Sequence, residues 1–173
     1  MSFFQRIFGE AKQREPLQPL YRAIVAKGRE PAWYRDGQVP DTLDGRFDMI
    51  AAILSLLLIR LETEGEAARR ESVLLTEIFI DDMDASLRQI GIGDFVVGKH
   101  VGRMMSALGG RLGAFRAAAE SGDWRAAVRR NIFRDSPPGE DQVDWVAERL
   151  RGLAAWLGET ERGTILAGRL PLP

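Results

Sequence analysis

Cysteine is absent from this 173-residue sequence, and histidine occurs once, as His100. Without cysteine there is no disulfide, no thiolate nucleophile, no iron–sulfur cluster and no cysteine-bound zinc. One histidine cannot supply the paired Glu-x-x-His motifs of a di-iron helical bundle, and no serine forms an evident nucleophile–base signature with it. A GxxxxGK[ST] phosphate loop is also missing, and Gly91-Ile92-Gly93 follows no strand, so it does not fit a dinucleotide-binding fingerprint. The sequence therefore predicts no catalytic, cofactor-binding or metal-binding residues.

Long hydrophobic runs are missing as well. The longest uncharged apolar stretch, Met49–Ile59, has eleven residues, whereas a membrane-spanning helix needs about 20. Residues 1–15 are interrupted by Arg6 and do not form a secretory signal. Their apolar residues share one side of a helix, which allows either a weak in-plane membrane anchor or a short amphipathic helix folded onto the domain. We expect a cytoplasmic protein, and peripheral contact with the inner face of the cytoplasmic membrane stays an open alternative.

The apolar residues that are present repeat with helical period. We predict helices at residues 17–30, 43–62, 66–89, 94–119, 124–133, 140–158 and 160–167. The stretch Pro31–Pro40 is predicted to be a loop that Trp33 and Tyr34 anchor, and Met49–Ile59 to be a buried core helix. The prediction is an all-α protein of about six or seven helices in one compact domain, residues 16–173, preceded by the amphipathic segment 1–15.

The predicted helix at residues 94–119 is rich in glycine. Five glycines lie in it: Gly98, Gly102, Gly109, Gly110 and Gly113. Each costs about 1 kcal/mol relative to alanine in a helix interior. We therefore expect another backbone to approach this helix closely, either in a tight helix crossing within the domain or in a bound segment.

The net charge of -1 conceals an uneven distribution. Residues 41–94 carry five basic and twelve acidic side chains, net -7, whereas residues 95–134 carry eight and two, net +6. These two blocks either pair with each other or present surfaces of one sign to a partner. The basic block could meet phosphates of RNA or of lipid head groups, but it contains no RRM, KH or zinc-finger signature. No DNA partner is predicted.

An acidic run, Glu77, Asp81, Asp82 and Asp84, lies in the predicted helix at 66–89. One interpretation is magnesium–diphosphate binding, as in all-α isoprenoid synthases with a DDxxD motif. The spacing here, DDMDA, places the last aspartate one position early, and no second acidic motif of that kind follows. The alternative is a solvated or internally paired face, in which Asp84 and Arg88 form a favourable i,i+4 pair.

The stretch Phe79–Arg111, FIDDMDASLRQIGIGDFVVGKHVGRMMSALGGR, resembles the signature of the ubiquinol–cytochrome c chaperone family. The matching positions are Asp82, Met83, Asp84, Leu87, Arg88, Gly91, Gly93, Asp94, Val97, Gly98, Lys99, Met104, Gly110 and Arg111. Upstream segments, among them Trp33-Tyr34 and Gly45-Arg46-Phe47-Asp48, also resemble the family, so the similarity covers roughly residues 20–120. Gln89, His100 and Leu108-Gly109 depart from the usual pattern.

The resemblance implies an assembly factor of the cytochrome bc1 complex, with no enzymatic activity and no cofactor. Its mitochondrial members are associated with ribosomes and with newly made cytochrome b, and this chain looks like a bacterial member without a transit-like leader. The partner-binding residues that we predict are Asp81, Asp82, Asp84, Arg88, Asp94, Lys99, Arg103 and Arg111. The expected client is cytochrome b or a bc1 assembly intermediate. Two alternatives stay open: a magnesium-dependent diphosphate enzyme that uses the acidic run, and a membrane- or ribosome-binding module that uses the basic block.

Overall fold

The predicted all-α architecture is confirmed. The computed structural model describes residues 14–89 and 94–171, apart from the side chains of Leu87 and of residues 94–101, and within those ranges all regular structure is helical. The α-helices are α2 (Gln18–Gly28), α3 (Pro31–Arg35), α4 (Leu43–Glu62), α5 (Arg69–Gln89), α6 (Asp94–Ser121), α7 (Trp124–Asn131), α8 (Glu140–Glu159) and α9 (Arg162–Leu166). Two short 3-10 helices, η1 (Glu15–Leu17) and η2 (Gly65–Ala68), precede α2 and α5.

Helix α4 forms the centre of the domain. Thr42 caps its N-terminus, because the Thr42 hydroxyl accepts a hydrogen bond of 3.1 Å from the Gly45 N–H. The apolar run Met49–Leu58 is buried on every side, as expected for a helix that is hydrophobic all round. The predicted core helix is therefore confirmed. No helix within the described ranges is long and apolar enough to cross a membrane.

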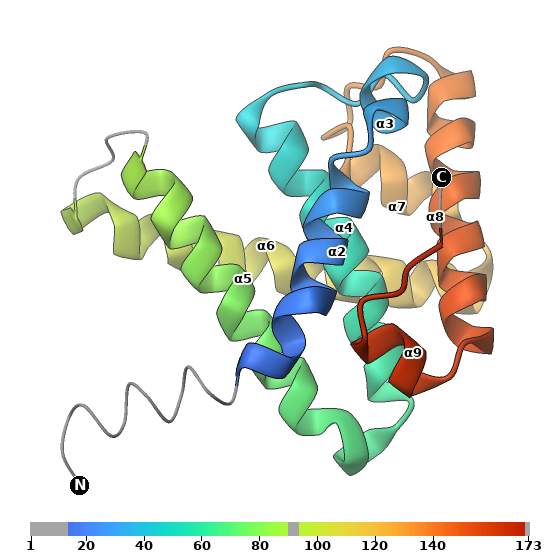
Figure 1. The fold of residues 1–173 in the computed structure, drawn as a ribbon. Helices are drawn as coiled ribbons and strands as arrows, with labels where there is room; N and C mark the ends of the chain where they lie inside the picture. Colours follow the sequence, from blue (N-terminus) through green and yellow to red (C-terminus); the bar gives the residue numbers. More distant parts are fainter. Residues whose placement is uncertain (1–13, 90–93, 172–173) are drawn as a thin grey trace, which may run out of the picture.

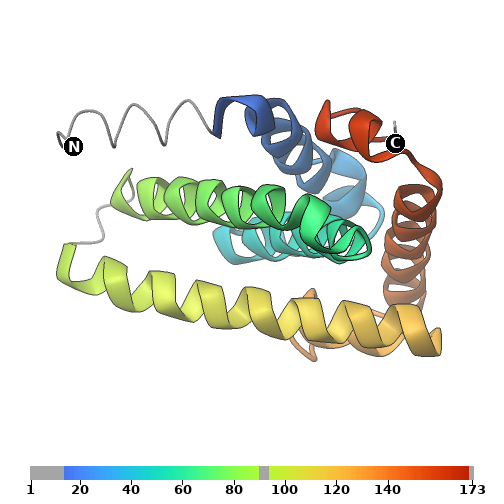
Figure 2. The ribbon, with the colours of Figure 1, turned by 90° about the horizontal axis from the view of Figure 1, so that it is seen from below.

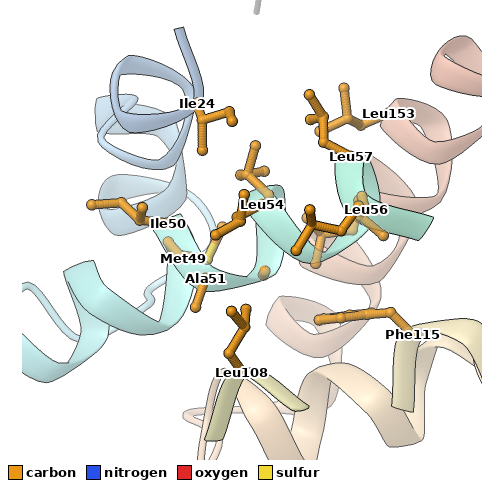
Figure 3. Packing of buried hydrophobic residues seen from close by; sticks show 14 of the residues in the cluster. Ile24, Met49, Ile50, Ala51, Leu54, Leu56, Leu57, Leu108, Phe115 and Leu153 are labelled. Carbon is orange, nitrogen blue, oxygen red and sulfur yellow. The ribbon is translucent and has the colours of Figure 1, made fainter. Parts of the chain in front are cut away.

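The other long helices surround α4, and α2, α5, α6 and α8 all contact it. Figure 2 shows α2 on one side, α4 and α5 between, and α6 on the opposite side, while α8 closes one end. In the core, Ile24 of α2 faces Ile50 and Leu54 of α4, and Leu108 and Phe115 of α6 approach from the other side (Figure 3).

The prediction of a loop at Pro31–Pro40 is wrong for its first half, which forms α3. Pro31 occupies the first turn of that helix, where its fixed φ and missing N–H are tolerated. The two aromatic residues do anchor the segment. The Trp33 indole N–H donates to the Lys27 carbonyl at 2.8 Å, and the Tyr34 hydroxyl donates to the Gly28 carbonyl at 2.7 Å.

The C-terminal end of α5 and the N-terminal end of α6 lie at the same end of the molecule. Both reach past the other helices, and they project together from the body (Figure 1). Helix α5 contributes Ile78, Phe79 and Met83 to the core, whereas the first buried residue among the described side chains of α6 is Leu108. We call the described parts of this projection, residues 77–89 of α5 and 102–113 of α6, the α5–α6 arm. The arm carries most of the residues that the sequence predicts to bind a partner.

Candidate functional site

The acidic run lies on the α5–α6 arm, and three of its carboxylates bind Arg14 or Tyr21. Arg14 donates to Glu77 at 2.9 Å and also pairs with Asp81. The Tyr21 hydroxyl donates to Asp82 at 2.7 Å. Burial, reinforced by this hydrogen bond to Asp82, raises the pKa of Tyr21 above its ordinary value. Glu77 and Asp81 therefore share one guanidinium of the same chain, whereas Asp82 binds a hydroxyl of α2.

Two further predicted residues of the arm bind each other. Arg88 donates to Asp84 at 2.7 Å, and both side chains keep a large exposed fraction. The predicted i,i+4 pair is thus confirmed. Arg103 lies on an exposed turn of α6. Asp94 begins α6, but the side chains of Asp94 and Lys99 lie outside those that the structure describes.

Arg111 is not on the surface, which corrects its assignment as a partner-binding residue. Its side chain is 8% exposed and pairs with Asp48 of α4, whose side chain is 1% exposed. Arg134 binds the other oxygen of Asp48 at 2.8 Å and reaches Asp44 at 2.9 Å. Burial raises the pKa of Asp48 and lowers the pKa of Arg111, and their mutual attraction opposes both changes. Arg111 therefore fixes α6 against α4 and is not available to a partner.

Intramolecular ion pairs account for most of the basic block. Arg111 and Arg134 bind the acidic block through Asp48 and Asp44, and Arg116 binds Glu62 of α4 at 2.7 Å. Two more arginines bind the start of α8: Arg125 pairs with Glu140 at 2.7 Å and with Asp144, and Arg129 pairs with Glu140. The hydrogen bond from Arg129 holds the pKa of Glu140 below its ordinary value. The internal pairing of the two charge blocks, one of the two alternatives from the sequence, is the arrangement found for Arg111, Arg116 and Arg134. Arg125 and Arg129 instead bind carboxylates that lie outside the acidic block.

The four α6 glycines whose surroundings the structure describes do not lie in a tight helix crossing, contrary to that expectation; Gly98 lies outside them. A Cβ atom added at Gly102, Gly109, Gly110 or Gly113 would meet no atom within 4 Å. These glycines are exposed, and Met105 on the same helix is 38% exposed. The crowded glycines lie elsewhere: a Cβ at Gly28 would meet the Ile50 backbone of α4 at 2.9 Å. Helix α6 thus presents an open, nearly side-chain-free strip, which we call the α6 glycine face.

A shallow pocket of about 590 Å³ lies beside α5, further from the tip of the arm. It is lined by Arg14, Glu66, Arg69, Arg70, Val73, Leu74 and Glu77. Its charges are mixed, and Glu77 already binds Arg14. Among the side chains that the structure describes, no three acidic or histidine residues gather closely enough to bind a metal ion. The acidic run therefore forms no metal-binding group within the described part of the chain.

Comparison with known proteins identifies the family of the chain. The family model for ubiquinol–cytochrome c chaperones matches residues 35–170, which extends the resemblance into the C-terminal third of the chain. Among solved structures, the crystal structure of the Cbp3 homolog from Brucella abortus is similar at a TM-score of 0.80 and 29% identity. The similarity covers 98% of this chain and 95% of that one. No curated protein matches. Since the family model spans most of its length, the chain belongs to the ubiquinol–cytochrome c chaperone family.

Proposed function

We propose that this protein is an assembly chaperone of the cytochrome bc1 complex that binds newly made cytochrome b or an assembly intermediate containing it. The observation that carries the proposal is the family match over residues 35–170. The geometry supports it, because Glu77, Asp81 and Asp82 bind groups of the same chain, and the described glycines of α6 leave an open helix face.

The α5–α6 arm is the surface that we assign to the client. The α6 glycine face lets another helix approach closely, since small residues allow backbones to pack together. Met105 adds a flexible apolar side chain of the kind that adapts to different partners. The exposed Asp84–Arg88 pair lies on the neighbouring helix. A client segment that is apolar and helical, with a charged group near one end, would complement this surface.

The two alternative functions find less support in the geometry. A magnesium–diphosphate site needs carboxylates that converge, whereas Asp81 and Asp82 bind Arg14 and Tyr21. A membrane- or ribosome-binding surface needs cations that are free to meet phosphates, whereas Arg116, Arg125 and Arg129 bind carboxylates of the same chain.

Deletion of the gene in the native host tests the role itself. We expect less spectroscopically detected cytochrome b and lower ubiquinol–cytochrome c reductase activity, both restored by the intact gene. Normal cytochrome b content and normal reductase activity in the deletion strain would refute the proposal.

Affinity capture from the same host tests the surface. Gly109→Leu covers the α6 glycine face without a clash, because no atom lies within 4 Å of its Cβ position, and Gly158→Leu in α8 is an equally open control. We expect the first variant to recover about tenfold less cytochrome b by mass spectrometry and the second to match the wild type. The exchange Asp84→Arg with Arg88→Asp keeps an ion pair but reverses its direction. If both the exchange and Gly109→Leu leave capture unchanged, the client binds elsewhere.

A further inference from the structure

A second concave surface lies away from the α5–α6 arm, where α8 faces α2 and α3. It is a pocket of about 320 Å³, which we call the α8 pocket. Its lining consists of Lys27, Trp33, Arg149, Gly152, Leu153, Trp156 and Pro171. Trp33 and Leu153 are buried parts of the core, so the inner wall of the pocket is rigid and apolar. None of the lining residues belongs to α5 or α6, and the inference below is independent of the client surface.

Arg149 is held over two indole rings at this pocket. Its guanidinium carbon lies 4.6 Å from the centre of the Trp145 ring and 5.6 Å from that of Trp33. These distances are typical of cation–π contacts, which use the faces of the rings. No carboxylate of the described residues pairs with Arg149, and nearby Asp36 is bound by Arg35 through two hydrogen bonds of 2.7 Å. The N–H donors at the edge of the Arg149 guanidinium are thus oriented and available to an anion.

Gly152 keeps the pocket open. It lies in the interior of α8, one turn after Arg149, where alanine would favour the helix more. A Cβ atom at this position would meet no atom within 4 Å, so packing within the described protein does not require a glycine. A larger side chain would project from the lining into the pocket. Trp156, one turn further along α8, is only partly buried and forms another part of the wall.

The neighbouring part of this surface already binds extended backbone. After α9, residues 169–171 are not helical, and they run back along α8 (Figure 1). Lys27 donates from Nζ to the Pro171 carbonyl at 2.9 Å and also pairs with Glu30 at 2.8 Å. Leu170 packs against the core. The surface between α2 and α8 therefore supplies an amine that binds a peptide carbonyl, that of Pro171. It also supplies apolar contacts for the side chain of the preceding residue, Leu170.

We propose that the α8 pocket binds an extended peptide segment of a partner protein that carries a carboxylate next to an apolar side chain. Arg149 binds the carboxylate through its edge donors, the geometry that gives Arg–carboxylate pairs their strength and direction. The apolar side chain enters the space beside Gly152, between Trp33 and Trp156. The volume of about 320 Å³ is at the lower end for ligand pockets and suits one such side chain.

Nuclear magnetic resonance on the full chain tests this proposal with two capped peptides, acetyl-Leu-Pro-Glu-Leu-amide and acetyl-Leu-Pro-Gln-Leu-amide. The only charge in either peptide is the glutamate side chain. We expect the glutamate peptide to move the indole N–H signals of Trp33, Trp145 and Trp156. The signal of Trp124, which packs against Phe115 elsewhere in the core, stays in place. The glutamine peptide should bind about tenfold more weakly. Equal binding of the two peptides, or no binding of either, overturns the proposal.

Two variants and one small acid complete the test. Arg149→Gln should remove the preference for the glutamate peptide, and Gly152→Leu should abolish binding of both peptides by filling the pocket. Gly158→Leu, equally open on the same helix but outside the lining, should bind like the wild type. Retention of binding by Gly152→Leu would show that the peptide lies elsewhere. Hexanoate offers the same carboxylate and apolar chemistry without a peptide backbone. If hexanoate binds more tightly than the glutamate peptide, the occupant is a small acid and the proposal of a partner peptide is wrong.

Discussion

Asp48 is the residue whose replacement we expect to destabilise the fold most clearly through charge alone. Its carboxylate, 1% exposed, lies between Arg111 and Arg134, and only Arg134 has substantial access to water. In Asp48→Ala the guanidinium of Arg134 can turn toward solvent. Arg111 cannot. It keeps the carbonyls of Ala107 at 3.2 Å and Asn131 at 3.3 Å and the face of the Phe47 ring, 5.4 Å from its guanidinium carbon, but no carboxylate among the described residues. Its Nε is already buried without a hydrogen-bond partner among the described residues.

The expected cost follows from that isolated charge. Removing one partner of a buried ion pair typically costs about 3–5 kcal/mol, because the other charge remains desolvated. With a urea m-value of about 2 kcal/mol/M, this loss lowers the unfolding midpoint by roughly 1.5–2.5 M. Urea unfolding followed by circular dichroism at 222 nm measures it directly. The control is Glu62→Ala, which breaks the exposed pair with Arg116 and should cost less than about 1 kcal/mol.

A double variant distinguishes the effect of losing the ion pair from the effect of losing side-chain volume at the site. Asp48→Leu with Arg111→Met replaces both charges by apolar groups, and such replacements of buried pairs are often neutral or stabilising. We expect the double variant to unfold within about 1 kcal/mol of the wild type, whereas Asp48→Leu alone stays strongly destabilised. If Asp48→Ala costs less than about 1 kcal/mol with an unchanged m-value, our account of a buried charge that needs its partner is refuted.

Four further substitutions should change stability in directions that the contacts determine. Gly28→Ala forces a Cβ against the backbone of α4 and should cost about 1–3 kcal/mol in urea unfolding; Gly113→Ala, in open space, should instead stabilise by up to about 1 kcal/mol. Asp135 has φ +61, so Asp135→Gly should raise the melting temperature by about 2–4 °C, and no rise would contradict strain at this residue. Tyr21→Phe leaves Asp82 without its donor and should cost about 1 kcal/mol at pH 7. Because the pKa of Tyr21 is raised in the folded state, wild-type stability falls as pH rises above the unfolded value of about 10. The cost of Tyr21→Phe should therefore shrink at about pH 11, and a constant cost would contradict the linkage.

The features that the sequence predicts well are those set by local pattern. The eleven apolar residues of Met49–Ile59 are too short for a membrane span and too apolar for a surface helix, and they form the buried α4. The helical starts at Thr42 and Asp123 were predictable because their side chains accept hydrogen bonds from the first turn. The start of α3 at Pro31 was missed, because proline signals both a break and a first turn.

The features that could not be predicted depend on which helices meet. Five glycines in one helix indicate a helix face without side chains. They do not indicate whether that face packs against a neighbouring helix or is exposed to solvent. The structure places the neighbour at Gly28 instead, a glycine that ends α2 and carries no special pattern. Arg111 belongs to a basic block and looks like its other arginines, and only the approach of α4 buries it.

The ion pair of Asp48 and Arg111 and the exposed glycines of α6 are structurally connected. Burying Asp48 and Arg111 stabilises little in net terms, since their desolvation offsets much of their attraction. The pair does fix the crossing of α4 and α6, because a displacement of either helix leaves a desolvated charge alone. With α6 held at Arg111, its neighbours Gly109 and Gly113 on the other side can face solvent without the helix having to pack there. A buried ion pair on one side of α6 and an open strip of glycines on the other thus form one arrangement. The ion pair positions α6, and the opposite face stays open to the client that we propose.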